Sequence, residues 1–273
     1  MGNEKNKIPS ISVILIIISF FIMTVNKLIG IILITLIVIS NILKQKYLIN
    51  VIKGNKAYTT KNYTIAIEEY KKAVSSKYAN SGIIRGYILI ELKHGNPNNA
   101  KEFLDKLLKE RKFNDREMLT LNVSKALILW KTGNIESAIN NLKDLLSKEE
   151  SSYIYETLTS LLLIDGRVDE ALELLKKALE YDDTNNILKS NFGEANFKLG
   201  NTKIAEEIFK SLLEENILFI EPYYFYALIL KQKGENEKAI ELLEKSLDTN
   251  DSLLTTVSKD SATKILYELT PNI

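Results

Sequence analysis

The sequence lacks cysteine and has one histidine, His94, and four prolines among its 273 residues. Without cysteine the chain forms no disulfide and offers no thiolate to zinc, to an iron–sulfur cluster or to a covalent mechanism. A single histidine leaves little scope for a histidine metal site or for histidine acid–base catalysis. An excess of one charge sign is also missing, because the formal net charge is +1, and this argues against a strongly basic nucleic-acid binder.

Catalytic and phosphate-binding motifs are missing as well. No glycine-rich loop ends in Lys-Ser or Lys-Thr, so no phosphate cradle is predicted. Acidic pairs such as Glu206 and Glu207 are numerous, but adjacent carboxylates on a helix point apart and are solvated. His94 precedes Gly95 and is interpreted as the polar end of a helix. We therefore expect no catalytic residue, no metal, no cofactor and no small-molecule substrate, and we interpret the chain as not an enzyme.

Charge is almost absent from the first 43 residues. Two uncharged apolar stretches, residues 8–25 and 28–43, are separated only by Asn26 and Lys27. One continuous helix of this length would reach about 50 Å, whereas the hydrocarbon core of a bilayer is about 30 Å thick. We therefore expect a membrane anchor over residues 1–46, with both stretches crossing as a helical hairpin. A single span with the other stretch at the interface remains open. A cleaved signal peptide is disfavoured by the missing small-x-small site and by the second apolar stretch.

Lysines flank the hairpin on one side. They are Lys5 and Lys7 before the first stretch, and Lys44, Lys46, Lys53 and Lys56 after the second. The positive-inside rule makes this side cytoplasmic. Residues 44–99 hold ten basic and three acidic side chains, whereas residues 100–273 hold 23 basic and 31 acidic ones. The basic part therefore adjoins the anchor. The 32 lysines against four arginines indicate an AT-rich genome, and we expect a bacterial cell membrane with the rest of the chain in the cytoplasm.

The remainder of the chain is repetitive. An alanine recurs every 33 to 38 residues, at Ala66, Ala100, Ala138, Ala171, Ala205 and Ala239. A glycine precedes five of these alanines by five residues, at Gly95, Gly133, Gly166, Gly200 and Gly234, and Lys61 takes this place in the first repeat. A small residue stands twelve before the alanine at Gly54, Ala126, Gly193 and Ala227, with Ile88 and Thr159 as exceptions. Glycine ends a helix in a left-handed conformation, and small residues let two helices approach closely, so the pattern predicts helix–turn–helix units.

Four segments carry this pattern most clearly: GNIESAINNLKDLL, GRVDEALELLKKALEYDD, GNTKIAEEIFKSLL and GENEKAIELLEKSLDTN. Their apolar residues follow the helical spacing of i, i+3, i+4 and i+7. The units resemble tetratricopeptide repeats. This resemblance implies an all-α fold, a right-handed α-solenoid of about six repeats over residues 47–252. We expect residues 253–273 to form a capping helix over its open end, and one helix to continue from the second span into the first repeat.

The resemblance also implies a binding surface, the concave face formed by the first helix of each pair. Projected on this sequence, the face consists of Asn55, Tyr58, Arg85, Leu89, Lys93, Leu127, Trp130, Lys131, Glu156, Asn191, Glu194, Lys198, Tyr224 and Leu228. The family's two-carboxylate clamp for chaperone C-termini is not expected, because Asn191 and Lys198 have no matching pair in the neighbouring repeats.

Aromatic residues gather at positions 223–226. Tyr223 and Tyr226 share the helix face of Ala227 and are expected in the core, whereas Tyr224 and Phe225 are expected to face outward. Trp130 ends the first helix of its repeat and is compatible with either the concave face or the core.

The leading hypothesis is a membrane-anchored scaffold or adaptor that binds a protein or peptide in its concave groove at the cytoplasmic face. The alternative is a self-association or assembly module of a membrane complex. A third reading is an outward-facing envelope chaperone.

Overall fold

The computed structural model describes residues 11–215, 217–250 and 252–270, and every regular element in these ranges is an α-helix. The chain divides into two compact units, Met1–Ile90 and Glu91–Ile273, which are described separately. The predicted all-α fold is confirmed over the described residues.

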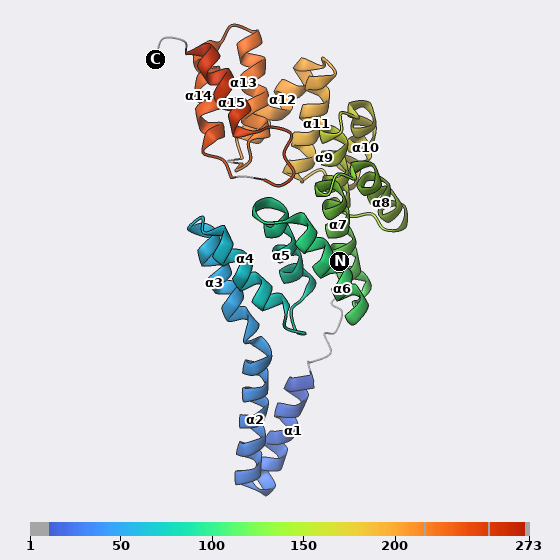
Figure 1. Ribbon diagram of the computed structural model, residues 1–273, viewed down its shortest axis with the longest axis vertical. Helices are drawn as coiled ribbons and strands as arrows, with labels where there is room; N and C mark the ends of the chain where they lie inside the picture. The colour runs from blue at the N-terminus through green and yellow to red at the C-terminus, as the bar shows by residue number, and fades with distance from the viewer. Residues whose placement is uncertain (1–10, 216, 251, 271–273) are drawn as a thin grey trace. The chain divides into compact units, whose positions relative to one another are not determined.

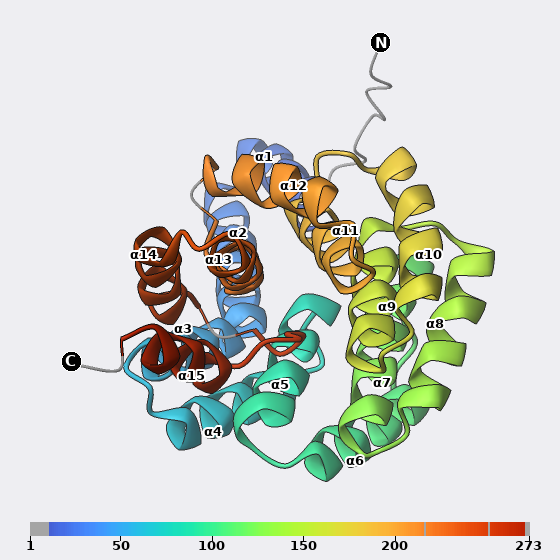
Figure 2. The ribbon, with the colours of Figure 1, turned by 90° about the horizontal axis from the view of Figure 1, so that it is seen from above.

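The first unit begins with two apolar helices, α1 (Ile11–Val25) and α2 (Lys27–Gln45), which lie side by side (Figures 1 and 2). Asn26 alone joins them, and its side-chain oxygen accepts a hydrogen bond from the backbone N–H of Ile29 at 3.2 Å. Gly30 permits the close approach, because a Cβ there would lie 2.4 Å from Cβ of Met23. Lys27 is the first residue of α2, so the turn is one residue shorter than predicted. Residues 8–10 of the first predicted span lie outside the described residues.

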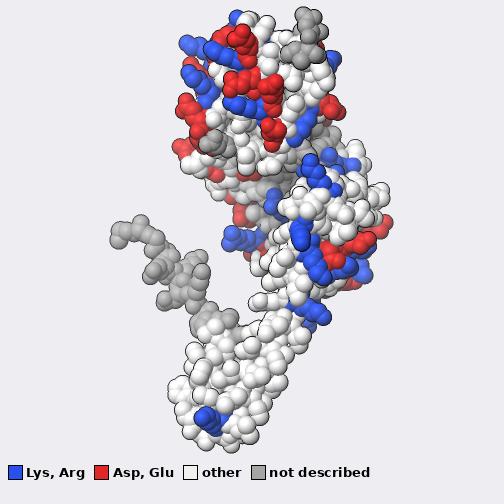
Figure 3. All heavy atoms as spheres, turned by 90° about the vertical axis from the view of Figure 1, so that its left-hand side faces the viewer, with Lys and Arg blue, Asp and Glu red and all other residues white. Residues whose placement is uncertain are grey.

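The hairpin exposes apolar side chains. Phe21 is 72% exposed and Val25 is 90% exposed. Figure 3 shows this part of the chain almost free of charged atoms, apart from basic atoms at the tip of the hairpin. The helical stretch Lys27–Thr59 is long enough and apolar enough to cross a membrane by length and composition, whereas the apolar helix Val13–Val25 is shorter.

Helix α3 (Tyr47–Thr59) continues from α2 with only Lys46 between them, and Lys46 itself has helical angles, φ −53° and ψ −32°. The predicted continuity from the apolar stretch into the first repeat is therefore confirmed. Helix α4 (Tyr63–Val74) packs back against α3. The ring of Tyr70 fills the space left by two glycines, since a Cβ at Gly54 would lie 2.7 Å from it and a Cβ at Gly86 of α5 (Ser81–His94) would lie 3.0 Å from it.

The second unit consists of helices that succeed one another in pairs along the chain. They are α6 (Pro97–Glu110), α7 (Asp115–Lys131), α8 (Ile135–Lys148), α9 (Ser152–Ile164), α10 (Val168–Tyr181), α11 (Asn186–Lys198), α12 (Thr202–Leu213), α13 (Glu221–Gln232), α14 (Asn236–Leu247) and α15 (Lys259–Leu269). Seen from above, α7, α9, α11 and α13 form an inner layer, and α8, α10, α12 and α14 form an outer layer (Figure 2). The described residues from α3 to α14 form twelve successive helices, the number that six helix pairs require.

Glycine turns close four of the pairs. The φ angles are +87° at Gly133, +78° at Gly166, +81° at Gly200 and +79° at Gly234, a region in which glycine has no steric penalty. Lys61 takes the same conformation in the first pair, with φ +58°.

Gly95 departs from this pattern, because it is not among the positive-φ glycines of the described chain. The next residue, Asn96, precedes Pro97 and is therefore held extended, at φ −119° and ψ 116°. Helix α5 consequently runs one residue closer to its turn than the corresponding helices of the glycine-closed pairs.

The small residues predicted between paired helices are buried, Ala126 and Ala227 among them. Thr159, where a small residue was expected, is also buried and donates its hydroxyl proton to the carbonyl of Tyr155 at 2.8 Å. The hydrogen bond satisfies the hydroxyl, so a polar residue is accommodated in the core.

The aromatic prediction for α13 is wrong at Phe225. This ring is buried between Phe197, at 5.4 Å between centroids, and Phe209, at 5.9 Å and stacked. Tyr223 and Tyr226 are only partly buried at its edges. Phe225 packs inward against the rings of α11 and α12, where aromatic contacts stabilise the C-terminal core.

Candidate functional site: the inner helix layer

The predicted residues of the first unit lie on α3 and α5. Asn55 is exposed, and its side-chain oxygen accepts a hydrogen bond from the Tyr70 hydroxyl at 2.6 Å. Tyr58 meets the ring of Tyr63 edge-on, at 5.5 Å between centroids. Arg85 and Leu89 are half-buried on α5. The structure therefore engages Asn55 within its own repeat.

Helix α5 extends into the second unit, where Lys93 lies in its last turn and is half-buried. A cation at this place interacts favourably with the negative end of the helix dipole. Lys93 therefore has a local role that requires no partner.

The end of α7 carries an aromatic–cation pair. Nζ of Lys131 lies 4.2 Å from the centroid of the Trp130 ring, within the range of a cation–π interaction. Trp130 is half-buried against the central core cluster, and burial lowers the pKa of Lys131. Leu127 is only 2% exposed, so the predicted face residue is covered within the described chain. It is covered because α7 packs against both α6 and α8.

Two predicted polar residues join α9 to α11 and the turn before it. Glu156 accepts a hydrogen bond from Nδ2 of Asn185 at 2.5 Å. Asn191 is 7% exposed, and its Nδ2 lies 3.0 Å from the hydroxyl oxygens of both Thr159 and Ser160. A buried amide needs such partners, so the side chain of Asn191 is engaged by α9.

Glu194, which the projection places on the concave face, lies on α11 and is fully buried, at 0% exposure. Its Oε1 pairs with Nζ of Lys198 at 2.6 Å. Burial raises the pKa of Glu194, and the charge of Lys198 opposes that rise. About a third of the Lys198 side chain is exposed, so the lysine is the member of this ion pair that contacts solvent.

Tyr224 and Leu228 are half-buried on α13 against the C-terminal core cluster. Burial raises the pKa of Tyr224, and the charge of Glu268 on α15 adds to the rise. Glu268 in turn pairs with Lys231 at 2.6 Å. Both α13 side chains therefore remain partly accessible at the end of the inner layer.

Sequence reasoning missed a second buried carboxylate, Glu221, and two hydroxyl residues that approach the inner layer. Oγ1 of Thr255 lies 2.6 Å from Oε1 of Glu221, and Oγ1 of Thr256 lies 2.6 Å from Oε2 of Glu194. Burial raises the pKa of Glu221, and the nearby charge of Glu194 raises it further. The sequence signal was a single acid inside an apolar run, FIEPYYFY, and a hydroxyl pair inside LLTTV.

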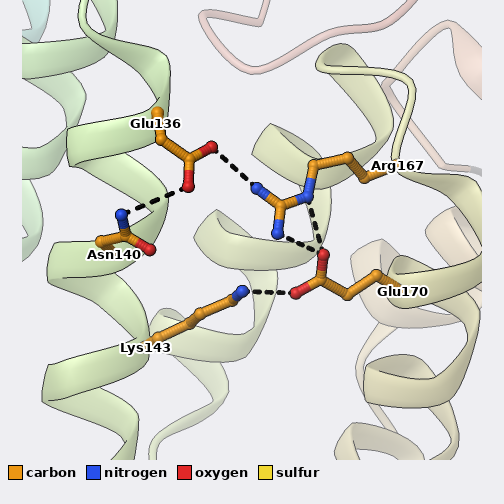
Figure 4. Close-up of polar contacts among 5 residues, drawn as sticks. All are labelled: Glu136, Asn140, Lys143, Arg167 and Glu170. Carbon is orange, nitrogen blue, oxygen red and sulfur yellow. Dashed lines mark hydrogen bonds and ion pairs between the residues drawn. The ribbon is translucent and has the colours of Figure 1, made fainter.

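The outer layer carries a polar network that joins α8 to α10 and the turn before it (Figure 4). Arg167 Nη1 pairs with Glu136 at 2.9 Å, Lys143 pairs with Glu170 at 2.5 Å, and Arg167 also bonds Glu170. Ion pairs this exposed contribute little free energy, about 0–1 kcal/mol each. The described residues contain no group of three metal-ligating side chains.

Models of the tetratricopeptide repeat family match residues 123–187, 162–216 and 220–252. The crystal structure of a tetratricopeptide repeat protein from Parabacteroides merdae ATCC 43184 superposes with a TM-score of 0.63 and 16% identity, over 96% of this chain and 99% of its own. A thermophilic repeat protein of Thermus thermophilus gives 0.54 at 19% identity, over 67% of this chain and 98% of its own.

A chain from the APC/C hetero-tetramer Cut9–Hcn1 gives a TM-score of 0.62 at 12% identity, over 81% of this chain and 42% of its own. No curated protein matches the sequence. At these identities the solved structures show a shared fold, and the family models confirm tetratricopeptide repeats within residues 123–216 and 220–252.

Proposed function

We propose, on the premise that this chain is built of tetratricopeptide repeats, that it is a scaffold whose inner helix layer binds another protein. The observation that carries the proposal is the accessible set on that layer, in which Trp130 and Lys131 stand at the end of α7 and Lys198 at the end of α11. Tyr224 and Leu228 follow on α13. Tryptophan and tyrosine side chains are enriched among binding hot spots.

The chemistry of this set favours a partner segment with apolar and acidic side chains. Burial lowers the pKa of Lys131, although its side chain remains exposed beside the Trp130 ring. A carboxylate of the partner placed beside Lys131 would restore the stabilisation that this ammonium lacks.

Site-specific photocrosslinking in native membranes tests the proposal. A photoreactive amino acid at Lys131 should give an adduct of one defined mass, and the same group at Lys245, which is exposed on the outer helix α14, should give none. Trp130→Ala in the Lys131 crosslinking chain should reduce the adduct. Equal adducts from the two positions, or none from Lys131, would refute binding on the inner layer.

Anchoring in a membrane is a further part of the proposal, supported by the exposed apolar surface of α1 and α2. Helix α2 has 19 residues, which is about 28 Å and close to the thickness of a hydrocarbon core, whereas the 15 described residues of α1 give about 22 Å. A hollow of about 440 Å³ beside α2 is lined by Lys44 and Tyr78, residue types that gather at membrane interfaces. We propose a hairpin whose two ends face the cytoplasm.

The chain's lack of cysteine makes the orientation directly testable. An impermeant maleimide should label Asn26→Cys in intact cells, because the turn would lie outside. Lys106→Cys on the exposed surface of α6 should be labelled only after lysis. Labelling of Lys106→Cys in intact cells would overturn the cytoplasmic placement and support an outward-facing chaperone.

Self-association is the second candidate, favoured by one observation. Tyr267 on the terminal helix α15 is exposed and borders a shallow hollow of about 500 Å³. Light scattering on the detergent-solubilised chain should then show a multimer that Tyr267→Ser converts to a monomer. A monomeric wild-type chain would reject this candidate.

A further inference from the structure

The inner layer of the second unit is partly occupied by the chain itself. Residues 252–258, which we call the crossing segment, connect α14 to α15 without forming a helix among the described residues. Figure 2 shows the segment inside the arc made by α9, α11 and α13. This course differs from the sequence expectation, which placed residues 253–273 in a capping helix. Among residues 252–270, only α15, from Lys259, is helical, and it packs against α14.

Both ends of the crossing segment are fixed by main-chain contacts. Before it, the N–H of Asn250 donates to the carbonyl of Leu218 at 2.9 Å. After it, Nζ of Lys259 donates to the carbonyls of Leu247 at 2.6 Å and Thr249 at 2.7 Å. These carbonyls lie at and just beyond the C-terminus of α14, where a cation is favourable. The segment is therefore held in place at its two ends.

Two adjacent hydroxyls attach the middle of the segment to two buried carboxyls. Thr256 donates to Glu194 on α11, and Thr255 contacts Glu221 on α13, each at 2.6 Å. Oγ1 of Thr255 also lies 2.8 Å from the carbonyl of Val257. The Thr255 hydroxyl is thus shared between the Glu221 carboxyl and the Val257 carbonyl, and it fixes the middle of the segment to α13.

Aliphatic residues flank the hydroxyl pair and enter the two core clusters. Leu254 packs against the central cluster of the second unit, and Val257 is buried in the C-terminal cluster. The sequence of contacts is therefore aliphatic, hydroxyl, hydroxyl, aliphatic. Helices α11 and α13 supply the carboxyls that receive the two hydroxyls.

We propose that the crossing segment is an intramolecular ligand, and that the partner of this part of the inner layer is an extended peptide with the same order of side chains, which displaces the segment on binding. The inference rests on the proposed function, because it takes the inner layer as the binding surface, and it adds both the chemistry of the ligand and a barrier to its entry. The segment is tethered at both ends, so it competes at an effective concentration of about millimolar. A free peptide therefore binds weakly until the segment is removed.

The test uses the full chain in detergent micelles and a fluorescent peptide that copies residues 252–258. In one variant these seven residues are replaced by a Gly-Ser linker of equal length. Fluorescence anisotropy should show the peptide binding the linker variant about tenfold or more tightly than the wild-type chain. Far-UV circular dichroism and size exclusion report whether the variant remains folded.

Peptide variants keep the test independent of protein folding. A peptide with valine at both threonine positions has the same shape without hydroxyls, and it should bind the linker variant about tenfold more weakly. In the protein, Glu194→Met with Glu221→Met should abolish binding, whereas Glu244→Met on the exposed face of α14 should leave it unchanged.

Equal binding of the two peptides, or equal binding by wild type and a folded linker variant, would overturn the inference. The scaffold proposal is separable from this result. If crosslinking from Lys131 still gives its adduct while the peptide fails to bind, the inference alone is wrong. If the peptide binds the linker variant as expected and Lys131 gives no adduct, the scaffold proposal is rejected together with the partner peptide, and only the contact of the crossing segment with α11 and α13 is retained.

Discussion

The contact between Gly193 and Phe209 sets a measurable limit on how closely α11 and α12 can pack. An added Cβ at Gly193 would lie 2.7 Å and 2.8 Å from two ring carbons of Phe209, about 1 Å inside the favourable carbon–carbon distance. The ring has no free space, because it is fully buried and stacked on Phe225. Gly193→Ala must therefore displace an aromatic core residue.

Two opposing contributions decide whether Gly193→Ala raises or lowers the free energy of unfolding. Alanine in a helix interior is favoured over glycine by about 1 kcal/mol. Overpacking of a tight core costs about 1–3 kcal/mol, and the depth of this overlap places the cost in the upper part of that range. We expect a net loss of about 1–2 kcal/mol in the free energy of unfolding. In a Phe209→Leu background the ring atoms are gone, so Gly193→Ala should become stabilising by about 1 kcal/mol relative to that background.

The assay is a double-mutant cycle from urea denaturation followed by far-UV circular dichroism. The expected coupling between the two sites is about 2–3 kcal/mol, near the upper end of values for contacting residues. Gly82→Ala on α5, where an added Cβ has its nearest contact at 3.3 Å, is the matched control and should be close to neutral. The reasoning fails if Gly193→Ala changes stability by the same amount with and without the Phe209 ring.

Three further outcomes follow from the polar contacts. Asn191→Ala removes the shared donor of two buried hydroxyls and should cost about 1–3 kcal/mol in urea denaturation, whereas Lys189→Ala on the same helix should cost little. The pKa of Glu170 is lowered, first because Lys143 donates a hydrogen bond to its carboxylate. The ionised carboxylate therefore stabilises the fold above the ordinary glutamate pKa, and this stabilisation is lost as pH falls. Glu170→Gln should remove this pH dependence of the urea midpoint. Burial raises the pKa of Glu221, so the stability that its protonated form contributes is present at low pH and is lost as pH rises. Glu221→Gln should therefore be more stable than wild type at neutral pH, and equal stability there would contradict the raised pKa.

The repeat pattern predicted the helix pairs because its determinants are local. Glycine at a fixed distance before alanine encodes a positive-φ turn followed by a close helix contact, and both requirements are met within one repeat. The same reasoning predicted which face of a helix a residue occupies, but it did not predict how deeply its side chain is buried. Leu127 occupies the predicted face and is nevertheless covered, because α7 has packed neighbours on both sides.

Contacts between repeats could not be predicted from the sequence, because the residues that meet are far apart in the chain. Asn191 donates hydrogen bonds to hydroxyls of residues 31 and 32 positions earlier in the chain. Glu194 accepts a hydrogen bond from a threonine 62 positions later. A weak apolar period in the tail predicted a helix, whereas tertiary hydrogen bonds to α11 and α13 hold residues 252–258 in a non-helical course. The part of the inner layer that the chain covers itself was therefore inaccessible to sequence reasoning.

The unbroken passage from α2 into α3 has a mechanical consequence. A helical stretch of 33 residues is a stiff rod about 50 Å long. If α2 is held in a bilayer, a change of tilt by about 10° displaces the far end of α3 by about 9 Å relative to the start of α2. Local thickness and curvature of the lipid would thus act as a lever on the first helix of the first repeat, and a scaffold built in this way would respond to the physical state of the surface that carries it.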